Sequence, residues 1–321
     1  MDAINEKSLS RTGGNTLKVR VFSLILAVVL LIGGGGLLFG CRSQPQTGTF
    51  TDDAGRTVEI AGGPERLVSF GPSITEILFA LDLGDRVVGV SDFCDYPPEA
   101  REKPRVGNAF SPALEKIAEL EPDLILTVKH EQLTSELEHL GFTYAVLDPK
   151  DMDGIMHTIR LVGDMTGRSQ QAGALVEDMQ RRVAAVTDKV KDRPPVRVFF
   201  IVDGTDLGMP WTAGPGSFID DIIQLAGGEN VAAGVAGAWA QLSIEEIVNA
   251  DPDVIIVQTM SGGEPTVSVA ELESHEVWGQ LTAVLAGNVY YIDGDLVSRP
   301  GPRIVEGLEE MARILHPDIF Q

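Results

Sequence analysis

The sequence predicts an α/β protein of two lobes with mainly parallel sheets, joined by one long interlobe helix. Three observations lead to this prediction. A chain of 321 residues, 44% of them hydrophobic, is longer than one small core requires and suits two globular lobes. A unit of helix, X-Pro-Asp and apolar strand occurs once in each half, and such strands are typical of parallel sheets covered by helices. A long stretch in which apolar residues recur at the spacing of a helix separates the two units.

The first forty residues have the pattern of a secretory signal peptide. Lys18 and Arg20 precede an apolar run over residues 21–32, which is followed by four consecutive glycines. An uncleaved transmembrane helix is the alternative, because about 20 apolar residues span a bilayer. Consecutive glycines disfavour a helix, however. We therefore expect a signal peptide over residues 1–40, and under either interpretation the remainder lies outside the cytoplasm.

The end of this segment resembles the lipobox of bacterial lipoproteins. Residues 37–41 read Leu-Leu-Phe-Gly-Cys. The resemblance implies that the sulfur of Cys41 carries the lipid and that Cys41 becomes the first residue of the mature chain. Phe39 departs from the small residue that is usual at its position. Residues 41–49 are then a polar, lipidated tether that anchors an extracytoplasmic protein to the cell membrane.

The N-terminal lobe is predicted over residues 50–165. A strand at 67–70 leads into a helix in which Ser73 is the N-cap and Glu76, three residues on, completes a capping box. The elements predicted after it are a strand at 87–90, a helix at 114–120, the tripeptide Glu121-Pro122-Asp123 and a buried strand at 124–128.

A single connecting helix is predicted over residues 166–193. Apolar residues fall there at helical spacing, and no proline interrupts them before Pro194. One long helix between two lobes is a stiff connection, so we expect little motion of the lobes. The C-terminal lobe is predicted over residues 194–321 and repeats the unit of the first lobe, with a strand at 196–202, a helix at 244–250, Asp251-Pro252-Asp253 and a strand at 254–257.

Composition excludes several classes of function. The formal net charge is -22, from 47 acidic and 25 basic residues, and such a surface repels nucleic acid. The only two cysteines, Cys41 and Cys94, cannot form a disulfide framework. The five histidines form no zinc-binding motif. We therefore expect no nucleic-acid partner and no metal site built by the protein.

An enzyme is the alternative class, for example a secreted hydrolase. Ser217 lies in a glycine-rich segment, but Pro215 and Ile219 occupy the positions where a Gly-x-Ser-x-Gly nucleophile elbow needs glycines. No Gly-x-x-x-x-Gly-Lys phosphate loop occurs. The carboxylates of Asp220 and Asp221 are expected on the surface of a helix. We therefore predict no catalytic residue.

Short segments of both lobes follow one another in a characteristic order and spacing. These are residues 64–76, 88–90, 94–100, 104–107, 114–117, 121–124, 226–230, 243–246 and 299–303. Together they resemble the helical-spine class of periplasmic binding proteins, which serve vitamin B12, ferric siderophore and haem importers of the ABC type, and the resemblance covers roughly residues 50–320. The resemblance implies two α/β lobes, a small-molecule ligand between them, and delivery of that ligand to the permease dimer by a monomeric binding protein.

Two glutamates take equivalent places in the repeated unit. Glu115 follows Leu114 in the first lobe, and Glu245 follows Ile244 in the second. Most such residues are merely solvated, but the resemblance implies that these two dock onto arginines of the permease. Exposed ion pairs contribute only about 0–1 kcal/mol each, so they would set register and association rate more than affinity.

The ligand is expected at the carboxyl ends of the strands, where loops of the two lobes converge. Three of these loops carry an aromatic residue, namely Tyr96, Trp211 and Trp239, although only 6% of the chain is aromatic. Any one of them could be a core or anchor residue, but several facing one cleft favour a large, flat, apolar ligand.

The resemblance is strongest to the B12-binding branch, which implies a cobalt corrinoid as ligand and no resident cofactor. It implies ligand contacts from Tyr96, Trp211, Trp239, Asp295 and Arg299. Ser73 and Phe110 are further candidates, because their loops are expected at the same cleft, and Phe110 stands where that branch often has Trp. Haem remains open, because Tyr96 could serve as an axial ligand. A ferric siderophore also remains open, although an anionic ligand calls for several cations and Arg299 is the main one expected in the cleft. Cys94 is expected to be a small buried thiol rather than a ligand to cobalt.

Overall fold

The computed structural model describes residues 48–320 of the chain. The predicted signal peptide, Cys41 and most of the predicted tether therefore lie outside the described residues. No helix within residues 48–320 is long and apolar enough to cross a membrane.

The first lobe is built on a four-stranded parallel sheet with the order β4-β3-β7-β8. Its strands are Leu67–Phe70, Val87–Val90, Leu124–Val128 and Tyr144–Leu147, numbered β3, β4, β7 and β8. The strands β3 and β8 are buried at every position, as expected when helices cover both faces of a sheet. The helices of this lobe are α2 (Pro72–Ala80), α3 (Leu114–Glu119), α4 (Glu131–His139) and α5 (Met152–Thr166). Two short antiparallel pairs complete it, β1 (Gly48–Thr51) with β2 (Thr57–Ile60) and β5 (Gly107–Asn108) with β6 (Ser111–Pro112), together with the 3-10 turns Gly84–Arg86 and Pro98–Glu102.

The second lobe repeats this topology. Its parallel sheet has the order β11-β9-β13-β14, from strands Val196–Ile201 (β9), Gly228–Asn230 (β11), Val254–Thr259 (β13) and Val289–Asp293 (β14). In both sheets the first strand along the chain pairs with the second on one side and with the third on the other. A two-stranded antiparallel ribbon of β10 (Trp211–Ala213) and β12 (Trp239–Gln241) follows β9. The helices are α7 (Phe218–Leu225), α8 (Ile244–Ala250), α9 (Val269–Ser274), α10 (Thr282–Leu285), α11 (Gly294–Val297) and α12 (Ile304–Leu315), with a 3-10 turn at Trp278–Gln280.

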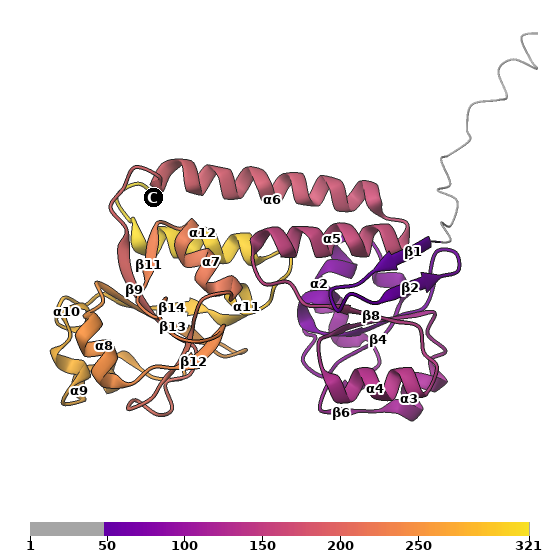
Figure 1. Cartoon of the computed structure of the whole chain (residues 1–321), viewed down its shortest axis with the longest axis horizontal. Coiled ribbons are helices and arrows are strands. Elements are labelled where there is room, and N and C mark those ends of the chain that lie inside the picture. Colours follow the sequence, from indigo (N-terminus) through magenta and orange to yellow (C-terminus); the bar gives the residue numbers. More distant parts are fainter. Residues whose placement is uncertain (1–47, 321) are drawn as a thin grey trace, which may run out of the picture. The chain divides into compact units, whose positions relative to one another are not determined.

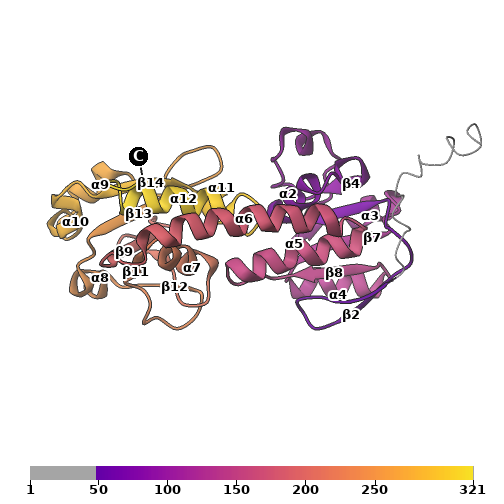
Figure 2. The same cartoon turned by 90° about the horizontal axis from the view of Figure 1, so that it is seen from above.

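One long helix, α6, connects the lobes. It spans Ser169–Val190 and follows α5 after Gly167, whose φ of 73° ends α5 in the left-handed conformation that glycine tolerates. It packs against α5 of the first lobe and against α7 and α12 of the second, and Figures 1 and 2 show it running beside α5 and α12. The predicted α/β fold of two lobes with parallel sheets and one long connecting helix is thereby confirmed.

The hydrophobic core crosses from one lobe to the other. One cluster of buried apolar side chains includes Leu67 of β3, Ile159 of α5, Val176 of α6, Ile219 of α7 and Leu308 of α12. Because these side chains are in one contiguous cluster, α5, α6, α7 and α12 act as packed elements rather than as a loose linker. The predicted stiffness of the connection has its physical basis in this shared core.

The first helix of the first lobe begins one residue earlier than predicted. Pro72 occupies its first position, Gly71 is the N-cap, and no side chain caps the helix. Proline suits that position because it has no N–H to satisfy and its φ is already helical. The predicted capping box of Ser73 and Glu76 is therefore wrong. The carboxylate of Glu76 instead contacts two arginines of the second lobe.

Candidate ligand-binding site

The loops that meet between the lobes leave the carboxyl ends of the parallel strands. Strand β4 leads to Asp95 and Tyr96, β7 leads to Lys129, and β14 leads to Asp295. In open parallel sheets this edge is where ligands bind, because side chains from several loops converge there. The duplicated topology brings the two edges, one from each lobe, to a common crevice.

Five charged side chains link the lobes at this edge, and we call them the interlobe charge cluster: Glu76, Asp95, Asp295, Arg299 and Arg303. The two oxygens of Glu76 accept hydrogen bonds from Arg303 at 2.6 and 2.9 Å. Arg299 donates from Nη1 to Asp95 Oδ1 at 2.7 Å and lies 3.3 Å from Glu76 Oε1. Its Nη2 pairs with Asp295 Oδ1 at 2.7 Å. Three carboxylates thus face two guanidinium groups, with Glu76 and Asp95 supplied by the first lobe and the arginines by the second.

Burial makes this cluster electrostatically strong. The side chains of Glu76 and Arg299 are only 2% and 9% exposed, so solvent screens their attraction little. Burial alone would raise the pKa of Asp95, but the hydrogen bond and charge of Arg299 outweigh it and lower that pKa below its usual value. Burial opposes the charge on Arg299, yet the hydrogen bond to Asp95 and the nearby Asp295 raise the pKa of Arg299. Both partners are therefore held in their charged forms.

Arg299, which was predicted to be the main cation of the cleft, has its charge matched within the protein. Three carboxylates already surround its guanidinium group. Lys129 and Lys150 line the crevice instead, and sequence reasoning missed both. Lys150 pairs with Asp148 at 2.6 Å, whereas the ammonium group of Lys129, an exposed residue, makes no ion pair or hydrogen bond within residues 48–320. Its position directly after β7 was the available signal.

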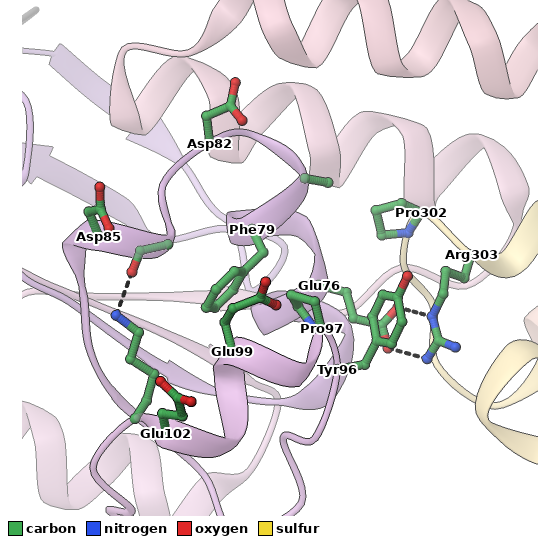
Figure 3. A pocket seen from close by; sticks show the side chains of 13 residues that line it. Glu76, Phe79, Asp82, Asp85, Tyr96, Pro97, Glu99, Glu102, Pro302 and Arg303 are labelled. Carbon is green, nitrogen blue, oxygen red and sulfur yellow. Dashed lines mark hydrogen bonds and ion pairs between the residues drawn. The ribbon is translucent and has the colours of Figure 1, made fainter.

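Two cavities flank the interlobe contact. The crevice between the lobes has a volume of about 150 Å³ and is lined by Ser73 and Lys129 from the first lobe and by Ser217 and Trp239 from the second. The other, the acidic cavity, has a volume of about 870 Å³ and lies mainly on the first lobe. Figure 3 shows Tyr96 and Phe79 at the acidic cavity together with the Glu76–Arg303 pair. Five acidic and two basic residues line the acidic cavity.

The two predicted tryptophans of the second lobe lie on one face of the β10–β12 ribbon. Trp211 pairs with Gln241, and Ala213 pairs with Trp239. Residues two apart on a strand share a face, and directly paired residues do too. Trp211 and Trp239 are therefore diagonal neighbours, 45% and 46% exposed. On the other face, Thr212 is buried and donates to the carbonyl of Phe200.

The remaining predicted aromatic residues come from the first lobe. The ring of Tyr96 lies 3.9 Å from the guanidinium carbon of Arg303 and is 44% exposed, a cation–π arrangement. Phe110 is 77% exposed, and its ring meets that of His130 edge-on at 4.8 Å. The structure does not bring all the predicted ligand residues to one cavity. Ser73 and Trp239 line the crevice, and Tyr96 lines the acidic cavity. Arg299 and Asp295 belong to the interlobe charge cluster, whereas Phe110 and Trp211 line neither cavity.

The two predicted docking glutamates occupy matching places. Glu115 is the second residue of α3 and Glu245 is the second residue of α8, and both side chains are exposed. Each is followed six residues later by a left-handed residue before Pro-Asp, Glu121 with φ 43° and Asp251 with φ 40°. The duplicated unit therefore places one exposed carboxylate at the second position of a corresponding helix in each lobe.

Three further predicted side chains can be placed. Cys94 is fully buried beside Ser91, its Sγ 3.1 Å from that hydroxyl, and burial raises its thiol pKa, so it is the small buried thiol that was expected. The prediction that Asp220 and Asp221 are surface carboxylates is wrong: Asp220 is buried and accepts from Asn230, and Asp221 accepts from the backbone N–H of Met152. Within residues 48–320 no group of three or more His, Cys, Asp or Glu side chains is placed to hold a metal ion.

Comparison with known proteins identifies the family. Residues 67–296 match the periplasmic binding protein family. An uncharacterized ABC transporter substrate-binding lipoprotein of Bacillus subtilis, YvrC, is 32% identical over 313 residues, which cover 93% of this chain and 97% of that protein. A cobalamin-binding protein of Halobacterium salinarum is 33% identical over 84% of this chain and 74% of its own length. The structure of the periplasmic heme-binding protein RhuT from Roseiflexus sp. RS-1 superposes with a TM-score of 0.69 at 29% identity and covers 81% of this chain and all of RhuT. The chain belongs to the periplasmic binding protein family, whose relatives here are substrate-binding proteins of transporters rather than enzymes.

Proposed function

We propose that this protein is a lipid-anchored binding protein that captures a corrinoid between its lobes and delivers it to an ABC importer. The face formed by Trp211 and Trp239 carries the proposal. Two large aromatic side chains, each nearly half exposed, share one face of the β10–β12 ribbon, and Trp239 also lines the interlobe crevice. Neighbouring exposed aromatic side chains are typical of a surface that a ligand or partner covers.

The relatives support a corrinoid over other flat ligands. A cobalamin-binding protein matches 84% of this chain at 33% identity. The YvrC relative, which matches at similar identity over nearly the full length, is named as a lipoprotein, and this name agrees with the proposed lipidation of Cys41. Both observations fit the motif resemblance of the sequence.

The ligand is tested by titrating the purified protein separately with cyanocobalamin, haemin and a ferric siderophore while tryptophan fluorescence is recorded. We expect cyanocobalamin to quench the fluorescence saturably and with the highest affinity, because Trp211 and Trp239 would contact it. Binding of the siderophore alone would overturn the choice of ligand and leave the transport role in place.

The aromatic face is tested with Trp239→Ala. We expect the affinity for cyanocobalamin to fall about 30-fold, the effect of losing about 2 kcal/mol from a buried aromatic contact. Leu285→Ala is the control, since Leu285 is 70% exposed on α10 and does not line the crevice. An affinity unchanged by Trp239→Ala, measured by equilibrium dialysis, would count against this face as the ligand surface.

Haem is the second candidate, and one observation favours it. Tyr96 lines the acidic cavity and is 44% exposed, and a tyrosine oxygen is one of the axial ligands that proteins offer to haem iron. If haem is the ligand, haemin binds more tightly than cyanocobalamin and Tyr96→Phe abolishes the visible absorption of a phenolate–iron complex. The same variant leaves corrinoid affinity within a few-fold of wild type if cobalamin is the ligand.

A further inference from the structure

The interlobe crevice has a charge opposite to that of the whole protein. Two lysines and one aspartate line it, Lys129, Lys150 and Asp148, in a chain with a net charge of -22. Lys150 and Asp148 pair with each other at 2.6 Å, so the ammonium group of Lys129 is the charge left without a partner in this crevice. A free cation in a crevice of an acidic protein attracts an anionic group.

A second polar group in the crevice also lacks a partner. Ser73 is 7% exposed and lines the crevice, and its hydroxyl makes no hydrogen bond within residues 48–320. The Ser73 oxygen is not among the fully buried atoms that lack a hydrogen-bond partner in the described residues, so it reaches the solvent in the crevice. The Ser73 hydroxyl can therefore donate a hydrogen bond to a ligand that enters there.

The backbone of α2 adds further donors at the same place. Ser73 is in the first turn of α2, whose N-terminus has neither a side-chain cap nor an acidic residue in its first turn. The first N–H groups of a helix have no intrahelical partner and carry partial positive charge, which favours anions. In contrast, the hydroxyl of Ser217 at the start of α7 already donates to the carbonyl of Gly214 and accepts from the backbone N–H of Asp220.

These donors adjoin one another because two neighbouring strands end together. In the sheet of the first lobe Phe70 pairs with Thr127. The next residues along are Gly71 and Val128, and a Cβ built on Gly71 would lie 3.1 Å from the Val128 side chain. Lys129 follows Val128 directly, Ser73 is two residues after Gly71, and both line the same crevice of about 150 Å³. This volume is below the about 300–1,000 Å³ of a pocket that encloses a drug-sized ligand, so it suits one substituent of a larger molecule.

We propose that the crevice is an oxyanion subsite, in which Lys129, the Ser73 hydroxyl and the first amides of α2 bind an anionic substituent at the edge of the macrocyclic ligand. This inference rests on the proposed function and names the part of the ligand that is recognised. The phosphodiester of a cobalamin and the carboxylate side chains of a haem are the two sources of such an oxyanion. The aromatic face then holds the flat ring while the crevice fixes its orientation.

The subsite is tested by comparing ligands that differ in the oxyanion. Dissociation constants are measured for cyanocobalamin and for dicyanocobinamide, which lacks the phosphodiester, with wild type, Lys129→Gln and Ser73→Ala. We expect the affinity for cyanocobalamin to fall about tenfold in Lys129→Gln and severalfold in Ser73→Ala, because each variant loses a hydrogen bond to a charged group. The affinity for dicyanocobinamide should change less than about twofold in both variants. Haemin and haemin dimethyl ester, which lacks the free carboxylates, are compared in the same way to test a carboxylate as the bound oxyanion.

Lys191→Gln is the matched control, because it removes the same charge from an exposed lysine paired with Asp188 at the end of α6. Equal losses for both members of a ligand pair, or no loss for either, overturn the subsite. If only haemin and its dimethyl ester bind, the corrinoid proposal fails. The subsite is then tested by whether Lys129→Gln weakens the binding of haemin more than that of the ester. If no macrocycle binds, the proposed function fails, and line broadening of inorganic phosphate in ³¹P NMR decides the subsite: broadening by wild type but not by Lys129→Gln supports it, and equal spectra overturn it.

Discussion

Glu76 is the residue on which the contact between the lobes depends most. Its carboxylate, 2% exposed, accepts hydrogen bonds from Arg303 and lies within 3.3 Å of Arg299. A buried carboxylate is stable only when its charge is matched. The sequence separation of 227 residues between Glu76 and Arg303 means that no local pattern in the chain reveals the pair.

Removing the charge of Glu76 should destabilise the protein strongly. In Glu76→Gln the Arg303 guanidinium loses the one carboxylate with which it pairs in the described residues, and Arg299 loses one of its three; breaking a buried pair costs about 3–5 kcal/mol. We expect a fall of this size in the free energy of unfolding, measured by urea denaturation. The matched control is Glu65→Gln, whose carboxylate is 71% exposed in its pair with Arg86 and should cost less than about 1 kcal/mol. Equal costs for the two variants would contradict the assignment.

The lowered pKa of Asp95 predicts a dependence of stability on pH. Burial raises this pKa, and Arg299 more than reverses the effect. Because the folded pKa lies below the unfolded value of 3.8, the unfolded state binds more protons as pH falls. The stabilisation is complete above the unfolded pKa and is lost as pH falls through the folded one. Asp95→Asn should therefore show a weaker loss of stability than wild type below about pH 4, as followed by thermal melts between pH 3 and 7. Parallel pH profiles would refute this role of Asp95.

The unit of helix, X-Pro-Asp and strand recurs in both lobes with the same hydrogen bonds. Asp123 accepts from the backbone N–H of Arg66 at 2.9 Å, and Asp253 accepts from that of Arg197 at 2.9 Å. Each arginine side chain in turn donates to the last carbonyls of the helix before the proline, at Leu120 in the first lobe and at Ala250 in the second. The repeat thus extends from the sequence to individual bonds.

This repeat predicts additive effects in the two lobes. Asp123→Ala removes the acceptor of two backbone N–H groups, those of Glu65 and Arg66. Asp253→Ala removes the acceptor of one, that of Arg197, so the two substitutions at these exposed sites should cost about 2 and about 1 kcal/mol of stability. The two sites share no partner, so the double variant should lose the sum of the two single costs. Thermal denaturation of the three variants tests this. A double variant no less stable than either single one would show that the units are not independent.

Local patterns predicted the elements well and the site less well. The apolar strands at 124–128 and 254–257 and the helix at 244–250 could be predicted because their signals are contiguous in the chain. The roles of Arg299 and Glu76 could not be predicted in this way. The two side chains pair with each other across the lobes, so Glu76 does not cap its own helix and the charge of Arg299 is matched. Lys129 was missed for the related reason that its lack of a partner is visible only once the neighbours are in place.

At the scale of the whole molecule, three features join the lobes: the shared core along α5, α6, α7 and α12, the interlobe charge cluster, and a close backbone approach at Gly301. A Cβ on Gly301 would lie 3.3 Å from the carbonyl oxygen of Ser73. Packed cores resist continuous deformation. We therefore predict that the separation between α3 of one lobe and α8 of the other is set by the fold, so that a partner contacting both lobes would meet a fixed spacing.

The last prediction follows from this fixed spacing. Glu115 and Glu245 present one exposed carboxylate on each lobe, and neither lines the crevice or the acidic cavity. We expect Glu115→Ala combined with Glu245→Ala to abolish uptake of the ligand by cells while its affinity for the purified protein stays unchanged. Each ion pair between one of these glutamates and the permease would contribute only about 0–1 kcal/mol. Losing both pairs, however, removes the charge complementarity that sets the orientation and the association rate of docking. Glu119→Ala with Glu273→Ala is the matched control, since it removes the same charge from other exposed positions of the two lobes. Normal uptake by the first double variant would show that these carboxylates do not dock the protein, and a parallel loss in the control would attribute the effect to net charge alone.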